Sequence, residues 1–236
     1  MAEQTRFFIV NTGPGEKENI TLKGHRILQA ADLVIASTRQ RERFAEELAG
    51  KEVIDGGHGL FSSLALRRLS AEEAEQQEAT MREKLESAHA AGQTIVLIES
   101  GDIGLFSPYR GYLTAFRHFK PQLVPGASSF NAANALLAQT ILGEGNRRLL
   151  MSDLESFMQA DRNCLPDVWV LFCMGLELPK LIKQIQALYP AATSVALIIN
   201  AGYDEHEVLR CSVSELGQYE DREISFPYCI IYIGVD

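Results

Sequence analysis

The stretch of residues 6–37 constrains the fold most, because it encodes two buried strands separated by a tight turn and a helix. Residues 7–10 are a short apolar run, and the turn Gly13-Pro14-Gly15 follows, in which proline fixes φ and glycine tolerates positive φ. Residues 22–31 carry apolar side chains at helical spacing, and residues 33–36 form a second apolar run without polar alternation. Such runs are typical of strands buried on both faces of a parallel sheet. We therefore expect a β-loop-α-β unit with a ligand-sized loop after its first strand.

The same alternation of short apolar runs and helical segments continues to about residue 140. Strands are expected at residues 53–54, 94–98 and 122–124, and helices at residues 71–91, 112–118 and 129–140. Alternation of this type predicts a doubly wound parallel sheet in the N-terminal half.

The pattern changes beyond residue 147, where strand candidates outnumber helices. These candidates are residues 148–151, 168–173, 195–199, 208–213 and 229–233, and one clear long helix is expected at residues 178–188. Fewer helices per strand favour a mixed, partly antiparallel sheet. We therefore expect an α/β protein of two domains, residues 1–125 and 126–236. Because no Gly/Ser-rich linker separates them, we expect close packing with a ligand cleft between the domains.

Composition narrows the class of protein. A net charge of −9 argues against a nucleic-acid partner, since such binding draws on Lys and Arg that neutralise phosphates. No apolar run approaches the roughly 20 residues that span a bilayer, and the N-terminus lacks a secretory segment, so we expect no membrane partner and a cytoplasmic location. The four cysteines lack Cys-x-x-Cys spacing, which favours free thiols over disulfides or a metal site.

Small-residue turns follow several of the expected strands. Gly13 and Gly15 resemble the start of a dinucleotide fingerprint, but Glu18 occupies the place of its third glycine, so an NAD site is disfavoured. A GxxxxGK[ST] phosphate loop is also absent from the sequence. The turns Ser100-Gly101-Asp102, Pro125-Gly126 and Asn200-Ala201-Gly202 also follow strand candidates. Backbone at these turns can line one crevice.

An ordered set of motifs spans nearly the whole chain. They are the opening unit, Ser100-Gly101-Asp102, Val124 to Ser129, Phe172 to Leu176, and Asn200 to Leu216 with the closing strand at residues 229–234. This order resembles the tetrapyrrole (corrin and porphyrin) methylases. The resemblance implies a two-lobed homodimer that uses S-adenosyl-L-methionine, releases S-adenosyl-L-homocysteine and methylates a carbon of a small-molecule tetrapyrrole. A precorrin or cobalt-precorrin of cobalamin biosynthesis is the expected substrate.

The resemblance also implies which residues contact the cofactor. They are Pro14, Ser100, Gly101, Asp102, Leu105, Ser128, Ser129, Met174 and Ala201. An Asp in a Gly-containing turn also commonly accepts hydrogen bonds from local amides, and Met174 lies in an apolar run that suits a core. Methyl transfer depends mainly on proximity and alignment, so an essential catalytic side chain is not demanded. His58 is a candidate for moving a proton or touching a corrin's metal, although an incidental loop histidine is favoured.

Three departures from the family pattern limit what the resemblance implies, two for the wall around the methionine moiety of the donor and one for the substrate. Ile103 stands where the third motif usually has proline, and Ser107 where glycine is common. Ser37 stands where uroporphyrinogen-methylating members carry an acid, which argues against that branch. Arg39, Arg41 and Arg43 follow the second strand. They fit either a solvated helix face or a site for a carboxylate-rich ligand.

Two alternatives stay open at this point. A methyltransferase of the same scaffold can modify a protein or RNA side chain, although the acidic charge disfavours RNA. A non-catalytic sensor that keeps the ligand site is the second alternative, motivated by the altered Gly101-Asp102-Ile103 loop.

Overall fold

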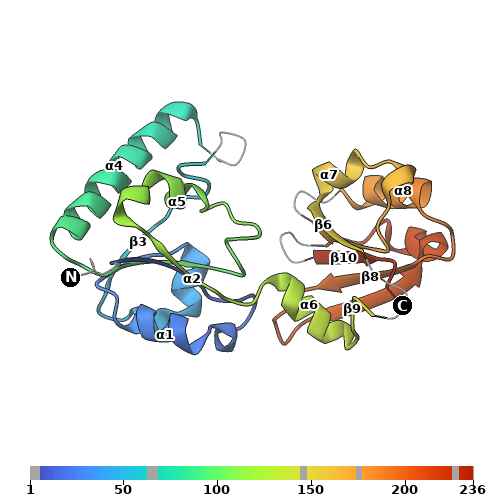
Figure 1. Cartoon of the computed structure of the whole chain (residues 1–236), viewed down its shortest axis with the longest axis horizontal. Coiled ribbons are helices and arrows are strands. Elements are labelled where there is room, and N and C mark those ends of the chain that lie inside the picture. Colours follow the sequence, from blue (N-terminus) through green and yellow to red (C-terminus); the bar gives the residue numbers. More distant parts are fainter. Residues whose placement is uncertain (1–5, 63–68, 144–147, 174–176, 225–228, 236) are drawn as a thin grey trace. The chain divides into compact units, whose positions relative to one another are not determined.

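The computed structural model describes residues 6–62, 69–143, 148–173, 177–224 and 229–235. The chain divides into two compact units, Met1–Ser128 and Ser129–Asp236 (Figure 1). The division lies three residues beyond the boundary at residue 125 expected from the sequence.

The first unit is built on a five-stranded parallel sheet with the order β3-β2-β4-β1-β5. Its strands are β1 (Phe7–Asn11), β2 (Leu33–Ile35), β3 (Glu52–Ile54), β4 (Ile95–Glu99) and β5 (Gln122–Val124). The opening β-loop-α-β unit places β1 and β2 in this sheet with β4 inserted between them. The predicted doubly wound parallel sheet is confirmed.

Helices cover both faces of this sheet (Figure 1). They are α1 (Leu22–Gln29), α2 (Thr38–Arg43), α3 (Ala45–Leu48), α4 (Ala71–Ala90) and α5 (Gly111–Ala115). Residues of α4 and α5 pack with Phe7, Ile9 and Leu97 on one face, while α1 and α3 pack with Val10 and Val96 on the other. Alternate residues of each strand thus enter opposite cores, which explains the unbroken apolar runs.

Local signals set several helix boundaries. The Thr21 side chain accepts a hydrogen bond from Gly24 N and caps α1, and Ser70 forms a capping box with Glu73 at the start of α4. Gly92, at φ +76°, follows the end of α4. The helix predicted at residues 112–118 is instead the short α5 followed by the 3-10 turn η3 (Arg117–Phe119). The sequence analysis did not predict α2 and α3, which are only one or two turns long.

The second unit is built on a five-stranded mixed sheet with the order β6-β7-β10-β8-β9. Its strands are β6 (Leu149–Asp153), β7 (Val168–Phe172), β8 (Ser194–Ile199), β9 (Glu207–Ser212) and β10 (Cys229–Ile233). β6 and β7 are parallel, whereas β10 is antiparallel to β7 and β8, and β9 is antiparallel to β8. The predicted mixed sheet is therefore confirmed.

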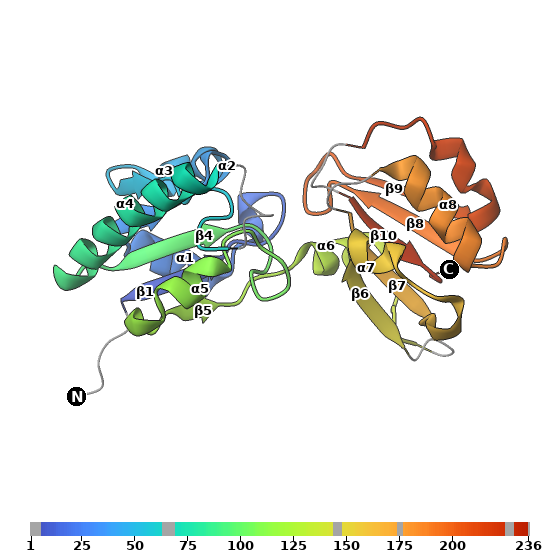
Figure 2. The same ribbon diagram turned by 90° about the horizontal axis from the view of Figure 1, so that it is seen from above.

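Among the described residues of this unit, helices α6 (Ser129–Leu137), α7 (Leu154–Met158) and α8 (Leu178–Leu188) cover the second sheet (Figure 2). Helices α7 and α8 pack on one face through residues such as Phe157 and Ile182. Helix α6 packs through Ala133 and Leu137 on the other face. The 3-10 segments described in this unit are η4 (Arg162–Cys164) and η5 (Val213–Tyr219). The first unit has a further 3-10 segment, η1 (Lys17–Asn19).

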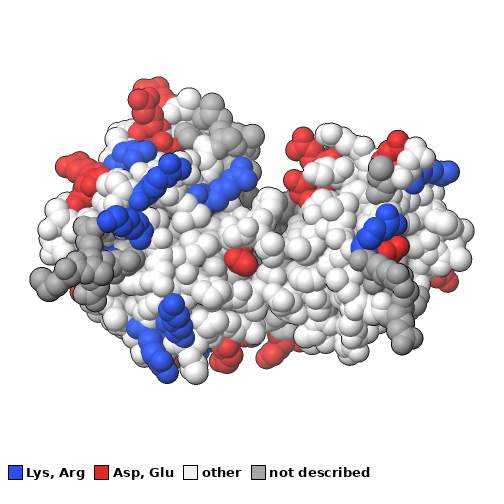
Figure 3. Space-filling model, in the orientation of Figure 1, with Lys and Arg blue, Asp and Glu red and all other residues white. Residues whose placement is uncertain are grey.

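Two properties of the whole chain complete the description. None of the described helices combines the length and apolar character needed to cross a bilayer. On the face drawn in Figure 3, basic and acidic side chains are interspersed among uncharged ones, and in places side chains of opposite charge lie next to each other.

Candidate functional site

The candidate site in the first unit lies at the carboxyl ends of the three neighbouring strands β4, β1 and β5. All three strands are parallel, so their carboxyl ends meet at the same edge of the sheet. Ligands of open α/β sheets bind outside this edge. The loops that leave it are residues 12–15, 100–102 and 125–128.

The first two loops are joined directly. Gly13 forms an antiparallel bridge with Gly101, and the Ser100 hydroxyl donates a hydrogen bond to Gly13 O at 3.3 Å. Thr12 donates to Glu99 O through both its backbone N at 2.8 Å and its hydroxyl at 2.9 Å. At φ +76°, Gly13 also approaches Asn19 so closely that an added Cβ would lie 2.5 Å from Asn19 O. The Gly-Pro-Gly turn therefore requires glycine for both its conformation and its packing.

Arg43, at the end of α2, forms hydrogen bonds with the first loop. Its Nη1 donates to Thr12 Oγ1 at 3.2 Å and to Gly13 O at 3.0 Å, and its Nη2 donates to Thr12 O at 3.2 Å and to Glu16 O. The planar guanidinium thus satisfies several loop carbonyls at once. For Arg43 this corrects both expectations from the sequence, because the side chain lies neither on a solvated helix face nor free to bind a ligand carboxylate.

Asp102 and Asn11 shape the loop after β4. Asp102 Oδ1 accepts a hydrogen bond from Gly104 N at 2.8 Å, which is the local turn role expected for this residue. Asn11 is 1% exposed, and its Oδ1 accepts from Ile103 N at 2.9 Å while its Nδ2 lies 3.5 Å from Asp102 Oδ1. Ile103, which replaces the usual proline, is buried in the core on the α4 side. The isoleucine of this altered loop is therefore part of the hydrophobic core.

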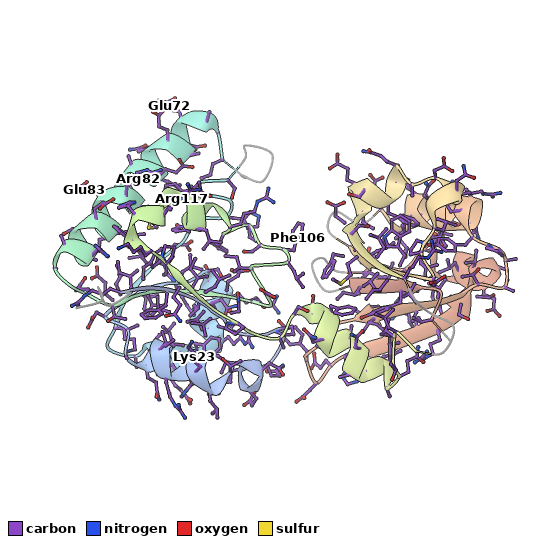
Figure 4. The ribbon with its side chains drawn as sticks, viewed as in Figure 1. Lys23, Glu72, Arg82, Glu83, Phe106 and Arg117 are labelled. Carbon is purple, nitrogen blue, oxygen red and sulfur yellow. The ribbon has the colours of Figure 1, made fainter. Side chains whose placement is uncertain are left out.

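Two apolar side chains of this same loop are exposed. Leu105 is 47% exposed and Phe106 is 37% exposed, and Figure 4 shows Phe106 on the loop that follows β4. Leu105 was predicted from the family resemblance, whereas Phe106 was missed. Exposed apolar side chains beside a candidate ligand edge are available for contact with an apolar ligand.

The third loop approaches β1 closely. An added Cβ on Gly126 would clash with Asn11 O, so the loop after β5 needs a glycine there. Thr21 Oγ1 lies 3.5 Å from Pro125 O and connects this loop to the start of α1. Ser128, which is buried, is the last residue of the first unit. Of the predicted cofactor residues, the structure thus places Pro14, Ser100, Gly101, Asp102, Leu105 and Ser128 on loops at one edge of the first sheet.

The remaining predicted cofactor residues belong to the second unit. Ser129 begins α6, and Ala201 follows β8 and is buried in the same apolar cluster as Ala133 and Leu137 of that helix. Asn200, before it, adopts φ 55°. Met174 lies outside the described residues, so its predicted cofactor contact stays a prediction.

A group of polar side chains that was not predicted from the sequence lies at the same edge of the first sheet. Burial raises the pKa of the Glu99 carboxyl to about 8, although the Ser100 amide counteracts part of this effect. Burial also raises the pKa of Tyr109, with a further contribution from Glu99, while an interaction with Ser37 opposes the shift. The sequence held a signal for Glu99, because this glutamate directly follows an apolar run that predicted a buried strand.

His58 is the candidate catalytic side chain named from the sequence. It is exposed on the turn after β3. Across the described ranges, no group of three His, Cys, Asp or Glu side chains is placed to hold a metal ion. A catalytic role for His58 stays a prediction.

A family model matches this chain over most of its length. The model describes the Tetrapyrrole (Corrin/Porphyrin) Methylases and matches residues 6–217. A cobalt-precorrin-4 C(11)-methyltransferase of Methanocaldococcus jannaschii is 21% identical over 245 residues, covering 99% of this chain and 89% of the relative.

Two further similarities concern a longer relative and a solved structure. A siroheme synthase of Psychrobacter arcticus is 26% identical over 226 residues, and the chain spans 39% of that longer relative. The crystal structure of a uroporphyrin-III C-methyltransferase from Thermus thermophilus, complexed with S-adenosylhomocysteine, matches with a TM-score of 0.69 and 20% identity. That match covers 97% of this chain and 92% of the other. This structural match shows a common fold.

Proposed function

Since the chain belongs to the tetrapyrrole (corrin/porphyrin) methylases, as predicted from its motifs, we propose that it methylates a precorrin or cobalt-precorrin in cobalamin biosynthesis. Family membership makes it an S-adenosylmethionine-dependent C-methyltransferase of a tetrapyrrole. The observation that carries this conclusion is the family match over residues 6–217, which includes four of the five motifs and the start of the fifth.

The donor site that we propose includes the joined loops of the first unit. A sulfonium is stabilised by carbonyl dipoles and close walls, and does not need a phosphate cradle. Pro14, Ser100, Gly101 and Asp102 lie on backbone turns at one strand edge, and Leu105 offers an exposed apolar side chain beside them. Ser128, Ser129, Met174 and Ala201 complete the proposed set. A donor site in a cleft between the two domains stays a prediction.

The acceptor that we propose is of the precorrin class. Ser37 takes the position where the uroporphyrinogen-methylating branch carries an acid, and its hydroxyl instead accepts a hydrogen bond from Gln40 N at 3.4 Å, which caps α2. The relative from Methanocaldococcus jannaschii, which matches along almost the whole chain, is named for a cobalt-precorrin-4. Both observations favour a partly methylated corrin precursor over uroporphyrinogen.

The test is methyl transfer from S-adenosylmethionine with a labelled methyl group to a panel of acceptors. The panel contains uroporphyrinogen III, precorrins, cobalt-precorrins and a cell extract rich in protein and RNA. We expect label in a precorrin or cobalt-precorrin. Label in uroporphyrinogen or in macromolecules would contradict the proposed acceptor, and binding without any transfer would favour the non-catalytic alternative.

Assembly and location belong to the same proposal. The family resemblance favours a homodimer in the cytoplasm. Light scattering on the purified chain measures its oligomeric state. A mass near 26.2 kDa, that of a single chain, would contradict the homodimer.

A further inference from the structure

Glu99 lies at the carboxyl end of a strand inside the first sheet. It is the last residue of β4, pairs in register with Asn11 of β1, and directly precedes the Ser100-Gly101-Asp102 loop. Ile95 and Leu97 of the same strand enter the core beneath α4 and α5, so strand alternation places Glu99 on that face. The carboxyl group therefore lies where an apolar core ends and the ligand edge begins.

The neighbours of Glu99 are polar but do not neutralise its charge. Tyr109 is buried on the loop before α5 and interacts electrostatically with both Glu99 and Asp55, and Ser37 after β2 interacts with the Tyr109 side chain. Tyr112, which interacts with Tyr109 and Asp55, is also buried, and its hydroxyl donates to Gly56 O at 2.5 Å. Within the described part of the chain, Glu99 forms no ion pair with Lys, Arg or His.

A carboxyl group in this position is costly for folding. Desolvation disfavours its ionised form, and the backbone N–H of Ser100 offsets that effect only in part. Titratable groups whose pKa is shifted towards neutrality by burial occur frequently at functional sites. Together with its place beside the joined loops, this makes Glu99 a candidate for proton transfer.

Carbon methylation of a pyrrole-type ring releases a proton, which a suitably placed base can accept. The π electrons of the ring carbon form the new C–CH3 bond, while the S–CH3 bond breaks and its electron pair remains on sulfur. The ring then carries a positive charge that it shares with its nitrogen. Loss of one proton, from that N–H or from an adjacent carbon, restores a neutral ring, and a base must accept this proton.

We propose that the Glu99 carboxylate is this base and becomes a neutral carboxylic acid as the methylated ring loses its proton. The inference rests on the proposed function. A carboxylate with a raised pKa is a stronger base than an ordinary glutamate, so the burial that destabilises the ion also suits it to this step. Among the titratable side chains near this group, Tyr109 interacts with Glu99, and Asp55 interacts with Tyr109.

The experiment compares three variants of the full chain with the wild type. Glu99→Gln keeps the size of the side chain but removes the base, and Glu99→Asp keeps a carboxylate. Glu83→Gln removes a carboxyl from the exposed face of α4 and serves as the matched control (Figure 4). Calorimetry measures S-adenosylhomocysteine binding, and single-turnover assays with the accepted precorrin measure methyl transfer from pH 5 to 9.

We expect Glu99→Gln to bind S-adenosylhomocysteine as the wild type does but to transfer methyl about 100- to 1,000-fold more slowly. Its pH profile should lose a rising limb centred near pH 8 in the wild type. Glu99→Asp should recover part of the rate and keep a rising limb, which covers the case in which the glutamine variant does not fold. Glu83→Gln should behave as the wild type.

Two results would overturn the inference in different ways. Wild-type transfer rates and an unchanged pH profile in Glu99→Gln would overturn the role of Glu99 alone. Failure of the wild type to methylate any tetrapyrrole would overturn the proposed function, and this inference with it.

Discussion

Single residues determine how the candidate site is held, and several of them lie behind the ligand edge. Arg43 and Asn11 use their side chains to satisfy backbone groups of the two joined loops. Neither role was predicted, because a sequence does not show which distant backbone group a guanidinium or amide will reach. Asp102 was predicted correctly as a turn residue, since its partner Gly104 is only two positions away.

Replacement of Arg43 tests whether the loop conformation matters for the donor. Arg43→Ala leaves the carbonyls of Thr12 and Gly13 without this donor, so we expect the free energy of unfolding to fall by about 2 kcal/mol and S-adenosylhomocysteine affinity to fall about tenfold. Arg43→Lys should restore little, because an ammonium cannot reproduce the planar fork. Arg39→Ala, exposed on the same helix, is the control for denaturation and calorimetry. Unchanged affinity in a destabilised Arg43→Ala would contradict the positioning role.

The stability of the wild type relative to Glu99→Gln should depend on pH. Burial raises the pKa of Glu99 from 4.5 to about 8, so between these values the folded state binds a proton that the unfolded state has lost. The stabilising effect of the neutral carboxyl is complete below about pH 4.5 and is lost as pH rises to about 8. We expect the difference in unfolding free energy to fall by up to about 5 kcal/mol over this range, measured by urea denaturation. A difference that is constant with pH would contradict the burial of this group.

At the scale of elements, the long segments followed from the sequence and the short ones did not. Helix α8 was predicted at residues 178–188 and is observed at Leu178–Leu188, because its apolar spacing continues over three turns. Helices α2 and α3 escaped prediction, since one or two turns carry too little periodicity. The loops were also only partly predictable. A glycine in the sequence predicts a turn, but it does not show which distant residue that turn contacts.

The loop after β4 offers a matched pair of glycines for a test. Gly101 at φ +71° and Gly50 at φ +77° both have positive φ, and an added Cβ would meet no protein atom within 4 Å at either position. Alanine should therefore cost each about 1 kcal/mol of stability through backbone strain alone. If the donor lies against the Ser100-Gly101-Asp102 loop, only Gly101→Ala should weaken S-adenosylhomocysteine binding, by at least tenfold in calorimetry. Equal affinities in the two variants would place the donor elsewhere.

At the scale of the whole molecule, each unit has a sheet with apolar cores on both faces. The fold class was predicted correctly for both, since the ratio of helices to strands changes near the boundary. Family membership, also predicted, followed from the order of motifs along the chain.

Ligand binding should stabilise the whole chain if the proposed function is correct. A ligand that binds only the folded state raises the free energy of unfolding by about 2.7 kcal/mol at a concentration 100 times its Kd. We expect S-adenosylhomocysteine to raise the melting temperature by several degrees in a thermal shift assay, whereas adenosine alone should have a smaller effect. The absence of any shift at millimolar ligand would contradict the donor assignment.

The sequence by itself determined the order and type of the long elements, the change from a parallel to a mixed sheet, and the family. These depend on periodicity and motif order, which are local or sequential properties of a chain. Only the tertiary structure decided that β4 lies between β1 and β2, that Arg43 and Asn11 hold the loops, and that Glu99 is half-buried near Tyr109. The physical reason is that strand order, burial and long-range hydrogen bonds depend on which distant segments pack together, and spacing along the sequence does not encode those pairings directly.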